Sequence, residues 1–280
     1  MYLFCYRKRP NFGDALNDYL WPRFIETPLE KQPGSPEVFV GIGTLLNEGL
    51  PPARILHIFG SGLGYGSVAS EAMANWKVHF VRGPLTARAL NLDPQLAVSD
   101  PGLLLHLTEN LEREKDIPCA FMPHHAVFSE RMQSLCEQAG VYFINPESSC
   151  AEVLDQIGRS RRLICSAMHG AIAAEALRVP WLPVTTSRQM LLSKWEDWAA
   201  SMELALRFHP LPVIWSQPAP SVTGHAVAGV KSVVFRKSLA RLARRGRFQL
   251  GSEAILRDRL SRMQEHISDF NEQRGNRTRA

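Results

Sequence analysis

A histidine followed by glycine, His169-Gly170, lies where a short apolar strand over residues 162–165 is expected to turn into a helix. Residues 171–177 are rich in strong helix formers. A helix that starts directly after a strand turns its free N–H groups and its positive dipole end toward the strand's carboxyl edge, where α/β proteins bind anions. We expect Ser166 to cap this helix, Gly170 to admit a ligand, and His169 to donate a proton. The alternative is a tight turn with a histidine packed under a loop.

Small polar residues also follow the other expected strands, at residues 11–14, 60–66, 82–83, 99–100 and 124–125. The carboxyl ends of parallel strands meet at one edge of a sheet, and ligands bind there in open α/β folds. The residues that we expect to bind a ligand at such an edge are Asn11, Gly60, Gly62, Arg82, Ser99, Asp100, His124, Ser166 and Gly170.

Three of these stretches have a second interpretation. The guanidinium of Arg82 suits a carboxylate or phosphate of a ligand, but it could pair with a neighbouring acid such as Asp100. The glycine run 60–66 lacks the spacing and the later acidic residue of a dinucleotide site. It is either a loop through which a sugar or anion reaches backbone N–H groups, or a flexible turn. Asn11 or Asp14 is expected to cap the helix that follows. Asp14 is either such a cap or first-turn acid, or a catalytic carboxylate.

Metal and thiol chemistry have little support in the sequence. His124, His125 and His169 stand in no HxxxH or HxxE pattern, so we expect no metal. Five cysteines without CxxC spacing argue against a disulfide framework and a zinc site. Cys119, Cys136 and Cys165 lie in apolar surroundings and are interpreted as core residues.

Strands and helices alternate along the chain, which predicts an α/β fold of two Rossmann-like domains with a cleft between them. Residues 1–112 form the first predicted domain and residues 113–215 the second, with a charged bridge at 109–116. Residues 216–280 are predicted to be a proline-rich connection and a basic helical tail, with the last ten residues unstructured. The expected strands are residues 2–6, 38–43, 55–59, 78–81, 118–122, 141–144, 162–165 and 181–184.

The net charge of +5 is unevenly distributed over the 280 residues. From Gly229 to Ala280 there are 13 Lys and Arg against 5 acidic residues, so the rest of the chain is close to neutral. This pattern favours a local anionic partner, such as a membrane surface, over a nucleic acid. No stretch approaches the roughly 20 apolar residues of a membrane-spanning helix, and residues 1–6 are too short for a signal peptide. We expect a cytoplasmic protein.

Taken in order, the motifs resemble those of the polysaccharide pyruvyl transferases, particularly the bacterial exopolysaccharide ketal-pyruvate transferases. The resemblance covers roughly residues 5 to 200. The matching residues are Asn11-Phe12-Gly13-Asp14, Gly41-Ile42-Gly43, Gly60-Ser61-Gly62, Val81-Arg82-Gly83-Pro84, Ser99-Asp100-Pro101, Pro123-His124-His125 and Met168-His169-Gly170-Ala171-Ile172.

The resemblance implies a GT-B-like pair of domains, the first on the acceptor side and the second on the donor side. It implies transfer of a pyruvyl unit from phosphoenolpyruvate to two hydroxyls of a sugar, forming a cyclic ketal and releasing phosphate, without a cofactor. On this basis His169 is the expected general acid and Arg82 an anion clamp. Asp14 or His125 is the expected base for the sugar hydroxyls.

One departure from the family concerns the position two residues before the histidine, where many members have arginine and this chain has Ala167. Arg188 and Lys194 are candidates for the missing anion contact. The basic stretch 236–247 fits a lipid-linked acceptor at the inner face of the plasma membrane, or it is a solvated helix face.

Two other functions compete with pyruvyl transfer. A GT-B glycosyltransferase would use a nucleotide-sugar and would need a nucleotide-binding carboxylate, for which Glu196 and Asp197 are the candidates. A non-catalytic sugar-binding relative would not need His169 for its role. The sequence does not specify the sugar, the stereochemistry of the ketal or the oligomeric state.

Overall fold

The computed structural model describes residues 1–64, 68–187, 190–214 and 222–278. The chain divides into two compact units, each built from separate stretches. Unit 1 comprises Met1–Leu105, Leu191–Ala205 and Gly251–Ala280, and unit 2 comprises His106–Met190 and Leu206–Leu250. These units differ from the domains predicted from sequence, because 191–205 and 251–280 belong with the N-terminal residues.

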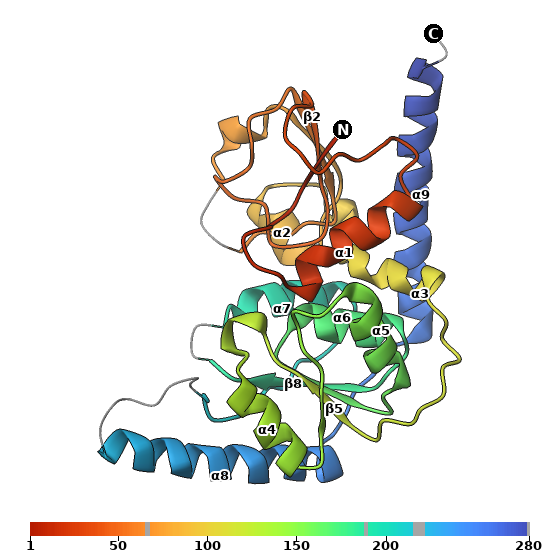
Figure 1. Cartoon of the computed structure of the whole chain (residues 1–280). Coiled ribbons are helices and arrows are strands. Elements are labelled where there is room, and N and C mark those ends of the chain that lie inside the picture. The colour runs from red at the N-terminus through yellow and green to blue at the C-terminus, as the bar shows by residue number, and fades with distance from the viewer. Residues whose placement is uncertain (65–67, 188–189, 215–221, 279–280) are drawn as a thin grey trace. The chain divides into compact units, whose positions relative to one another are not determined.

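Unit 1 contains a parallel sheet in the order β1-β2-β3-β4. Of its strands, β2 is labelled in Figure 1. Each strand is followed by a loop or helix at its carboxyl end, which is the arrangement that the alternating pattern predicted. The elements of unit 1 are β1 (Tyr2–Phe4), α1 (Phe12–Leu20), η1 (Trp21–Arg23), β2 (Glu37–Val40), β3 (Ile55–Phe59), η2 (Ser70–Met73), β4 (Trp76–Phe80), α2 (Pro84–Ala89), η3 (Pro94–Leu96), η4 (Pro101–Leu104), α7 (Leu192–Ser201) and α9 (Glu253–Thr278). The short helix α3 (Leu105–Thr108) follows η4.

The helix α9 packs on one face of this sheet through the aromatic side chain of Phe270. That ring contacts Phe39, His57, Phe59 and His79. The opposite face carries an aliphatic cluster of Val38, Val40, Leu56 and Ile58 with residues of α2. Because α9 continues to Thr278, the prediction that the last ten residues are unstructured is wrong for 271–278.

The buried His57 and the half-buried His79 lie under α9, and we expect them to make unit 1 sensitive to acid. His57 Nδ1 and His79 Nε2 lie 3.2 Å apart. Burial lowers the pKa of His57 to about 4, against a raising effect of Glu37, and lowers the pKa of His79 to about 3. Because both pKa values are below the ordinary value of 6.5, the unfolded chain takes up these protons first as the pH falls. The histidines therefore reduce stability progressively below about pH 6.5.

We predict that His79→Phe loses less stability than the wild type between pH 6.5 and pH 4, because the ring that resists protonation has been removed. Urea unfolding at a series of pH values measures the free energy of unfolding of both proteins. Curves that stay parallel down to pH 4 would show that His79 does not contribute to the acid sensitivity.

Unit 2 contains a second parallel sheet in the order β6-β5-β7-β8-β9. Its core joins the sheet residues Phe121, Ile164 and Leu182 to Met132 of α4 and Phe235 of α8. The elements of unit 2 are β5 (Ala120–Met122), η5 (His125–Val127), α4 (Glu130–Gln138), β6 (Tyr142–Phe143), α5 (Cys150–Arg159), β7 (Leu163–Cys165), α6 (Met168–Ala176), β8 (Trp181–Thr185), β9 (His209–Pro210) and α8 (Val222–Arg245). Strand β9 lies in the second predicted domain, where no strand was expected after residue 184.

The α/β class and the two parallel sheets with Rossmann-like alternation are confirmed. The five cysteines are all buried and free, as the interpretation of Cys119, Cys136 and Cys165 as core residues requires. Within the described ranges, no helix is both long enough and apolar enough to cross a membrane.

Candidate functional site

Three neighbouring strands of unit 2 end beside one another, and the hydroxyl of Ser166 joins their carboxyl ends. Ser166 Oγ accepts hydrogen bonds from the backbone N–H of His124, after β5, at 3.0 Å, and from the Thr186 hydroxyl, after β8, at 3.0 Å. Ser166 itself follows β7 and is fully buried. The turn that carries His169 and the turn that carries His124 are therefore held at the same edge of the sheet.

The prediction that Ser166 caps the helix with His169 is wrong. The N-cap of α6 is Ala167, one residue later, and an alanine side chain cannot accept a hydrogen bond. The Ser166 hydroxyl instead accepts hydrogen bonds from the residues that follow the two neighbouring strands. The positive end of α6 is thus left without a side-chain cap, which favours an anion at this position.

His169 is the second residue of α6 and is half-buried. Gly170, the next residue, has a packing role, since a Cβ there would lie 2.8 Å from Met122 Sδ at the end of β5. The sequence prediction that His169 lies at a strand–helix turn on the carboxyl edge is confirmed. Its role as an acid stays a prediction.

His124 and His125 occupy the turn after β5 with their ring centroids 4.3 Å apart. His124 Nδ1 accepts from the backbone N–H of Ala126 at 3.2 Å, so His124 caps η5. Among the described residues, no group of three or more His, Cys, Asp or Glu side chains is placed to hold a metal ion. Burial raises the pKa of the Cys165 thiol far above its ordinary value, which makes it a structural thiol.

At the carboxyl edge of unit 1, α1 begins with Asn11 as its N-cap, one of the two caps that the sequence allowed. Asn11 Oδ1 accepts from the backbone N–H of Asp14 at 2.9 Å, and the Asn11 amide group donates to the Asp14 carboxylate. One turn later the fully buried Asn17 exchanges hydrogen bonds with the backbone of Ile42, at 2.9 and 2.8 Å. Asn17 was not identified from the sequence, although it fixes the loop after β2 against α1.

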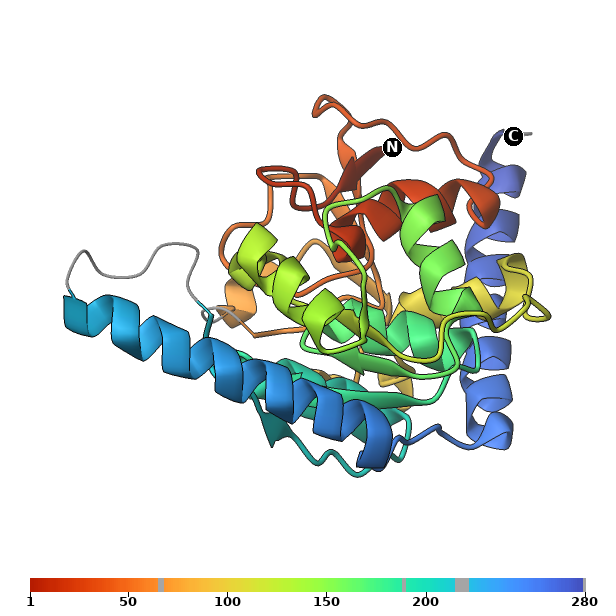
Figure 2. The same ribbon diagram turned by 60° about the horizontal axis from the view of Figure 1, so that its bottom comes forward.

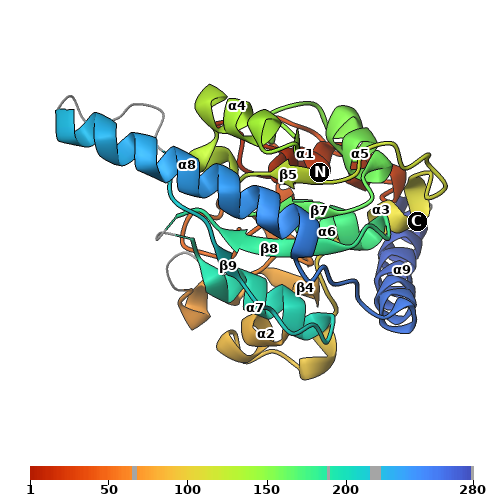
Figure 3. The ribbon, with the colours of Figure 1, turned by 90° about the horizontal axis from the view of Figure 1, so that it is seen from below.

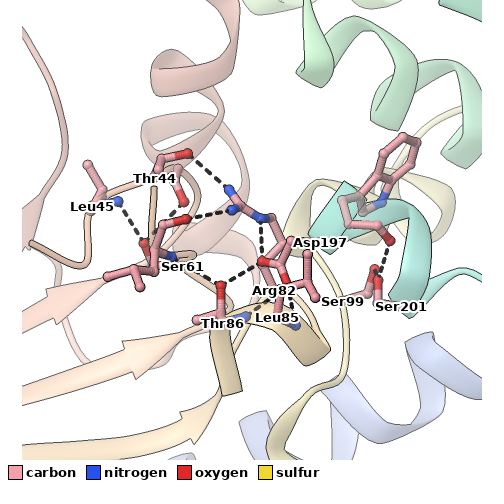
Figure 4. A network of polar contacts seen from close by, with 12 residues as sticks. Thr44, Leu45, Ser61, Arg82, Leu85, Thr86, Ser99, Asp197 and Ser201 are labelled. Carbon is pink, nitrogen blue, oxygen red and sulfur yellow. Dashed lines mark hydrogen bonds and ion pairs between the residues drawn. The ribbon is translucent and has the colours of Figure 1, made fainter. Parts of the chain in front are cut away.

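Arg82 is fully buried after β4, and its guanidinium contacts other residues of unit 1 (Figure 4). Its Nε donates to Asp197 Oδ2 at 3.1 Å, while Nη1 donates to the Thr44 hydroxyl at 2.9 Å and Nη2 to the Leu63 carbonyl at 3.2 Å. Its carboxylate partner is Asp197 of α7, and the suggested partner Asp100 is wrong. The contact of Arg82 with a substrate anion stays a prediction.

Asp197 also completes the N-terminus of α2, where the N-cap residue is Gly83. Its Oδ1 accepts from the backbone N–H groups of Leu85 and Thr86 at 2.9 and 3.0 Å, and its Oδ2 accepts from the Thr86 hydroxyl at 2.6 Å. A Cβ at position 83 would lie 2.1 Å from the Asp197 carbonyl oxygen, so only glycine admits this approach. Residues 82–86 thus bind a carboxylate of the chain itself.

The other residues predicted for this edge are also buried in unit 1. A Cβ at Gly62 would lie 2.2 Å from Arg82 Cζ, and one at Gly60 would lie 2.3 Å from Pro101 Cγ. Ser99 and Asp100 have no exposed surface; Ser99 Oγ lies 2.8 Å from Ser201 Oγ and Asp100 Oδ1 accepts from Gly102 N–H at 2.9 Å. Their predicted contacts with substrate stay predictions.

Lys194 is half-buried on α7, one turn before Asp197. Burial lowers its pKa to about 8; the charge of Arg82 lowers it further, and Asp14 raises it. Lys194 therefore lies close enough to Arg82 and Asp14 to interact with both charges, and it can be charged or neutral near neutral pH. Arg188, the other candidate for the missing cation, lies outside the described residues.

We predict that Lys194→Met removes a pH-dependent change in stability. Because the pKa in the folded protein, about 8, is below the ordinary 10.5, the unfolded chain binds this proton more tightly, and wild-type stability rises between pH 8 and pH 10.5. Chemical unfolding over this range should show a steeper rise for the wild type than for Lys194→Met. Lys31→Met, which alters an exposed lysine, should keep the wild-type slope; equal slopes for all three proteins would contradict the shift.

Comparison with known proteins identifies the family of the chain. A family model described as polysaccharide pyruvyl transferase matches residues 11–188. The chain is 35% identical over 207 residues to the succinoglycan biosynthesis protein ExoV of Rhizobium meliloti (strain 1021). This match covers 72% of the chain and 65% of the length of that protein, slightly less than two thirds.

A comparison with solved structures returned the solution structure of the E. coli RcsC C-terminus, which contains a linker region and a phosphoreceiver domain. The sequence identity is 14% and the TM-score 0.22, over 85% of this chain and 93% of that chain. A TM-score this low does not indicate a shared fold.

Proposed function

Because this chain belongs to the polysaccharide pyruvyl transferase family, we propose that it transfers a pyruvyl group from phosphoenolpyruvate to two hydroxyls of a sugar. The observation that carries the proposal is the family match over 11–188, which includes every candidate site residue except Lys194. The product is a cyclic ketal, and phosphate is released.

The proposed reaction is an acid–base addition that needs no cofactor. A proton is added to the methylene carbon of phosphoenolpyruvate, which becomes a methyl group and leaves C2 electrophilic. Two sugar oxygens then form bonds to C2 and lose their protons, while the bond from C2 to the phosphate oxygen breaks. One hydroxyl proton replaces the proton used on carbon, and the other leaves with phosphate.

The carboxyl edge of unit 2 supports the acid step of this scheme. His169 lies in the first turn of α6, where the positive end of the helix favours the carboxylate or phosphate of the donor. An acid in that turn lies next to the bound anion, as protonation of the donor requires. His125, the first residue of η5 after the neighbouring strand β5, is our choice of base in this unit. Asp14 of unit 1 stays the alternative base.

The glycosyltransferase alternative loses one of its two candidate carboxylates. The Asp197 carboxylate is buried and accepts hydrogen bonds from Arg82, Leu85 and Thr86, so it is not available to a nucleotide. Glu196 is exposed and stays a candidate. This difference favours the pyruvyl transferase over a nucleotide-sugar enzyme.

The acceptor in this proposal is a lipid-linked oligosaccharide of an exopolysaccharide repeat unit, and the protein acts at the cytoplasmic face of the membrane. The relative's name, which refers to succinoglycan biosynthesis, supports a polysaccharide acceptor. A GT-B-like cleft between the domains is likewise part of the proposal and comes from the family resemblance.

Ligand binding tests the proposal before an acceptor is identified. We expect phosphoenolpyruvate to raise the thermal unfolding temperature of the wild type, and nucleotide-sugars such as UDP-glucose and GDP-mannose to have no effect, because a ligand that binds only the folded state stabilises it. Inorganic phosphate at equal concentration controls for general anion binding. Stabilisation by a nucleotide-sugar and not by phosphoenolpyruvate would favour the glycosyltransferase.

A further inference from the structure

The basic charge of the C-terminal region is concentrated in one helix. Within α8 there are six Lys and Arg and no acidic residue, while α9 has five of each. The sequence contains no Asp or Glu at all between Glu203 and Glu253. The basic surplus recognised in the sequence is therefore mainly a property of α8, whereas the charges of α9 sum to zero.

One side of α8 is part of the core of unit 2. Ala228, Phe235, Leu239 and Ala243 are buried there, and the Phe235 ring meets Phe121 of β5 at 6.0 Å between centroids. On the α4 side, Arg131 Nη2 donates to the Ser232 hydroxyl at 2.8 Å. The N-terminal turns of α8 extend beyond α4 (Figures 2 and 3). These contacts fix which side of α8 faces solvent.

The solvent side of α8 carries a single stripe of apolar and then cationic residues. Val230, Val234, Lys237, Arg241 and Arg244 follow one another at steps of four, three, four and three, which keeps them on one face of a helix. All five are exposed, Val230 to 65% and Val234 to 44%. Val227 and Val233, at 49% and 43%, widen the apolar half. We call these residues the α8 stripe.

Beside the cationic half of the stripe, the surface is hollowed between α8 and the end of α4. The hollow has a volume of about 480 Å³ and is lined by Arg236, Lys237 and Arg244 together with Gln138 and Gly140. Three cations around one depression form a site of a size and charge suited to a phosphate headgroup.

We infer that the α8 stripe docks on an anionic lipid surface, with its valines in the headgroup–acyl boundary and its cations on lipid phosphates. Clusters of Lys and Arg without acids bind anionic lipid surfaces, and exposed apolar side chains beside them enter the headgroup–acyl boundary. The same face suits a second copy of this chain poorly, because it would bring two sets of cations together without a carboxylate to pair them. The inference deepens the proposed membrane location and rests on that part of the proposed function.

Flotation with lipid vesicles tests this surface directly. The wild type should float together with vesicles that contain phosphatidylglycerol. It should not float with vesicles of phosphatidylcholine alone. Each Lys or Arg near an anionic surface raises the partition coefficient roughly fivefold, so the triple variant Lys237→Gln/Arg241→Gln/Arg244→Gln should bind about 100-fold more weakly. The triple variant Lys8→Gln/Lys31→Gln/Arg88→Gln, which removes three exposed cations of unit 1, should bind like the wild type. Equal losses in both variants, or equal binding to both vesicle types, would overturn the inference.

The apolar half of the stripe has its own test. Val230→Ser/Val234→Ser should lower binding about tenfold at every salt concentration, whereas the contribution of the cations should fall as salt is raised. Inorganic phosphate at matched ionic strength should not displace the protein from vesicles; displacement would identify a site for free phosphate instead. Sedimentation equilibrium without lipid distinguishes a second copy. A valine-dependent dimer that does not bind vesicles would overturn the inference.

The vesicle assay contains neither phosphoenolpyruvate nor acceptor, so it is independent of the proposed reaction. A protein that floats but transfers no pyruvyl group would support the lipid-binding surface and contradict the proposed activity. A protein that transfers the group to soluble glycosides but never floats would support the proposed activity and contradict the lipid-binding surface. Thermal unfolding of each variant checks that these exposed substitutions leave the fold intact.

Discussion

His169→Ala is expected to lower kcat for acceptor-dependent phosphate release from phosphoenolpyruvate by about 10²–10⁴-fold, the usual contribution of a positioned general acid. The physical reason is that carbon protonation of the donor requires an acid next to its methylene group. The position of His169 in the first turn of α6 suits this role. Because the side chain is half-buried at the sheet edge, we expect stability to change by no more than about 1 kcal/mol.

Matched kinetics separate the acid from a residue that merely binds. His169→Gln keeps most of the volume and a hydrogen-bonding group but cannot supply the proton, so it should be as inactive as the alanine variant while KM for phosphoenolpyruvate changes less. His125→Ala should lower kcat if that histidine is the base, without loss of donor binding. A wild-type kcat in His169→Ala would show that His169 is not the acid. The proposed reaction would then need another acid, and His125 would be the next candidate.

Asp197→Ala is expected to lower the free energy of unfolding by about 3–5 kcal/mol, since it leaves the fully buried Arg82 guanidinium without its counter-charge. The same change deprives the N–H groups of Leu85 and Thr86 of their acceptor and so weakens the start of α2. Urea unfolding followed by circular dichroism measures this loss.

The neighbouring acid on α7 provides the control for that experiment. Glu196→Ala alters an exposed carboxylate on the same helix and should change stability by less than about 0.5 kcal/mol. Replacing both members of the pair, as Arg82→Met/Asp197→Leu, should recover part of the loss because no unpaired charge stays buried. A stability of Asp197→Ala within 1 kcal/mol of the wild type would contradict the network shown in Figure 4.

Local patterns in the sequence predicted the elements that depend on local physics. The alternation of strands and helices predicted both parallel sheets. Asn11 was one of two candidate caps, because a cap depends only on the few residues that follow it. The prediction that Ser166 is the N-cap was wrong by one residue, because the helix begins at Met168 and its N-cap is Ala167. The Ser166 hydroxyl instead accepts hydrogen bonds from His124 and Thr186, which follow two neighbouring strands.

Contacts between distant residues could not be predicted in this way. Arg82 and Asp197 are 115 positions apart, and no periodicity relates them. The glycines beside Arg82 were interpreted as openings for a ligand, whereas the space at Gly62 is filled by the guanidinium. Glycine identity shows that something comes close to the backbone, but it does not show what. The split of the basic region into a cationic α8 and a neutral α9 could have been noticed from the absence of acids in 204–252.

The most direct test of the proposed function follows the carbon atoms of the donor. Phosphoenolpyruvate labelled with ¹³C at C2 is incubated with the protein and a panel of lipid-linked or aryl glycosides, and the sugar product is examined by ¹³C NMR. We predict that the label appears as a ketal carbon bonded to two sugar oxygens, in equal amount to the phosphate released, and that both are lost in His169→Ala. Release of phosphate with the label recovered as free pyruvate, or label transfer that requires a nucleotide-sugar, would contradict the assignment as a pyruvyl transferase.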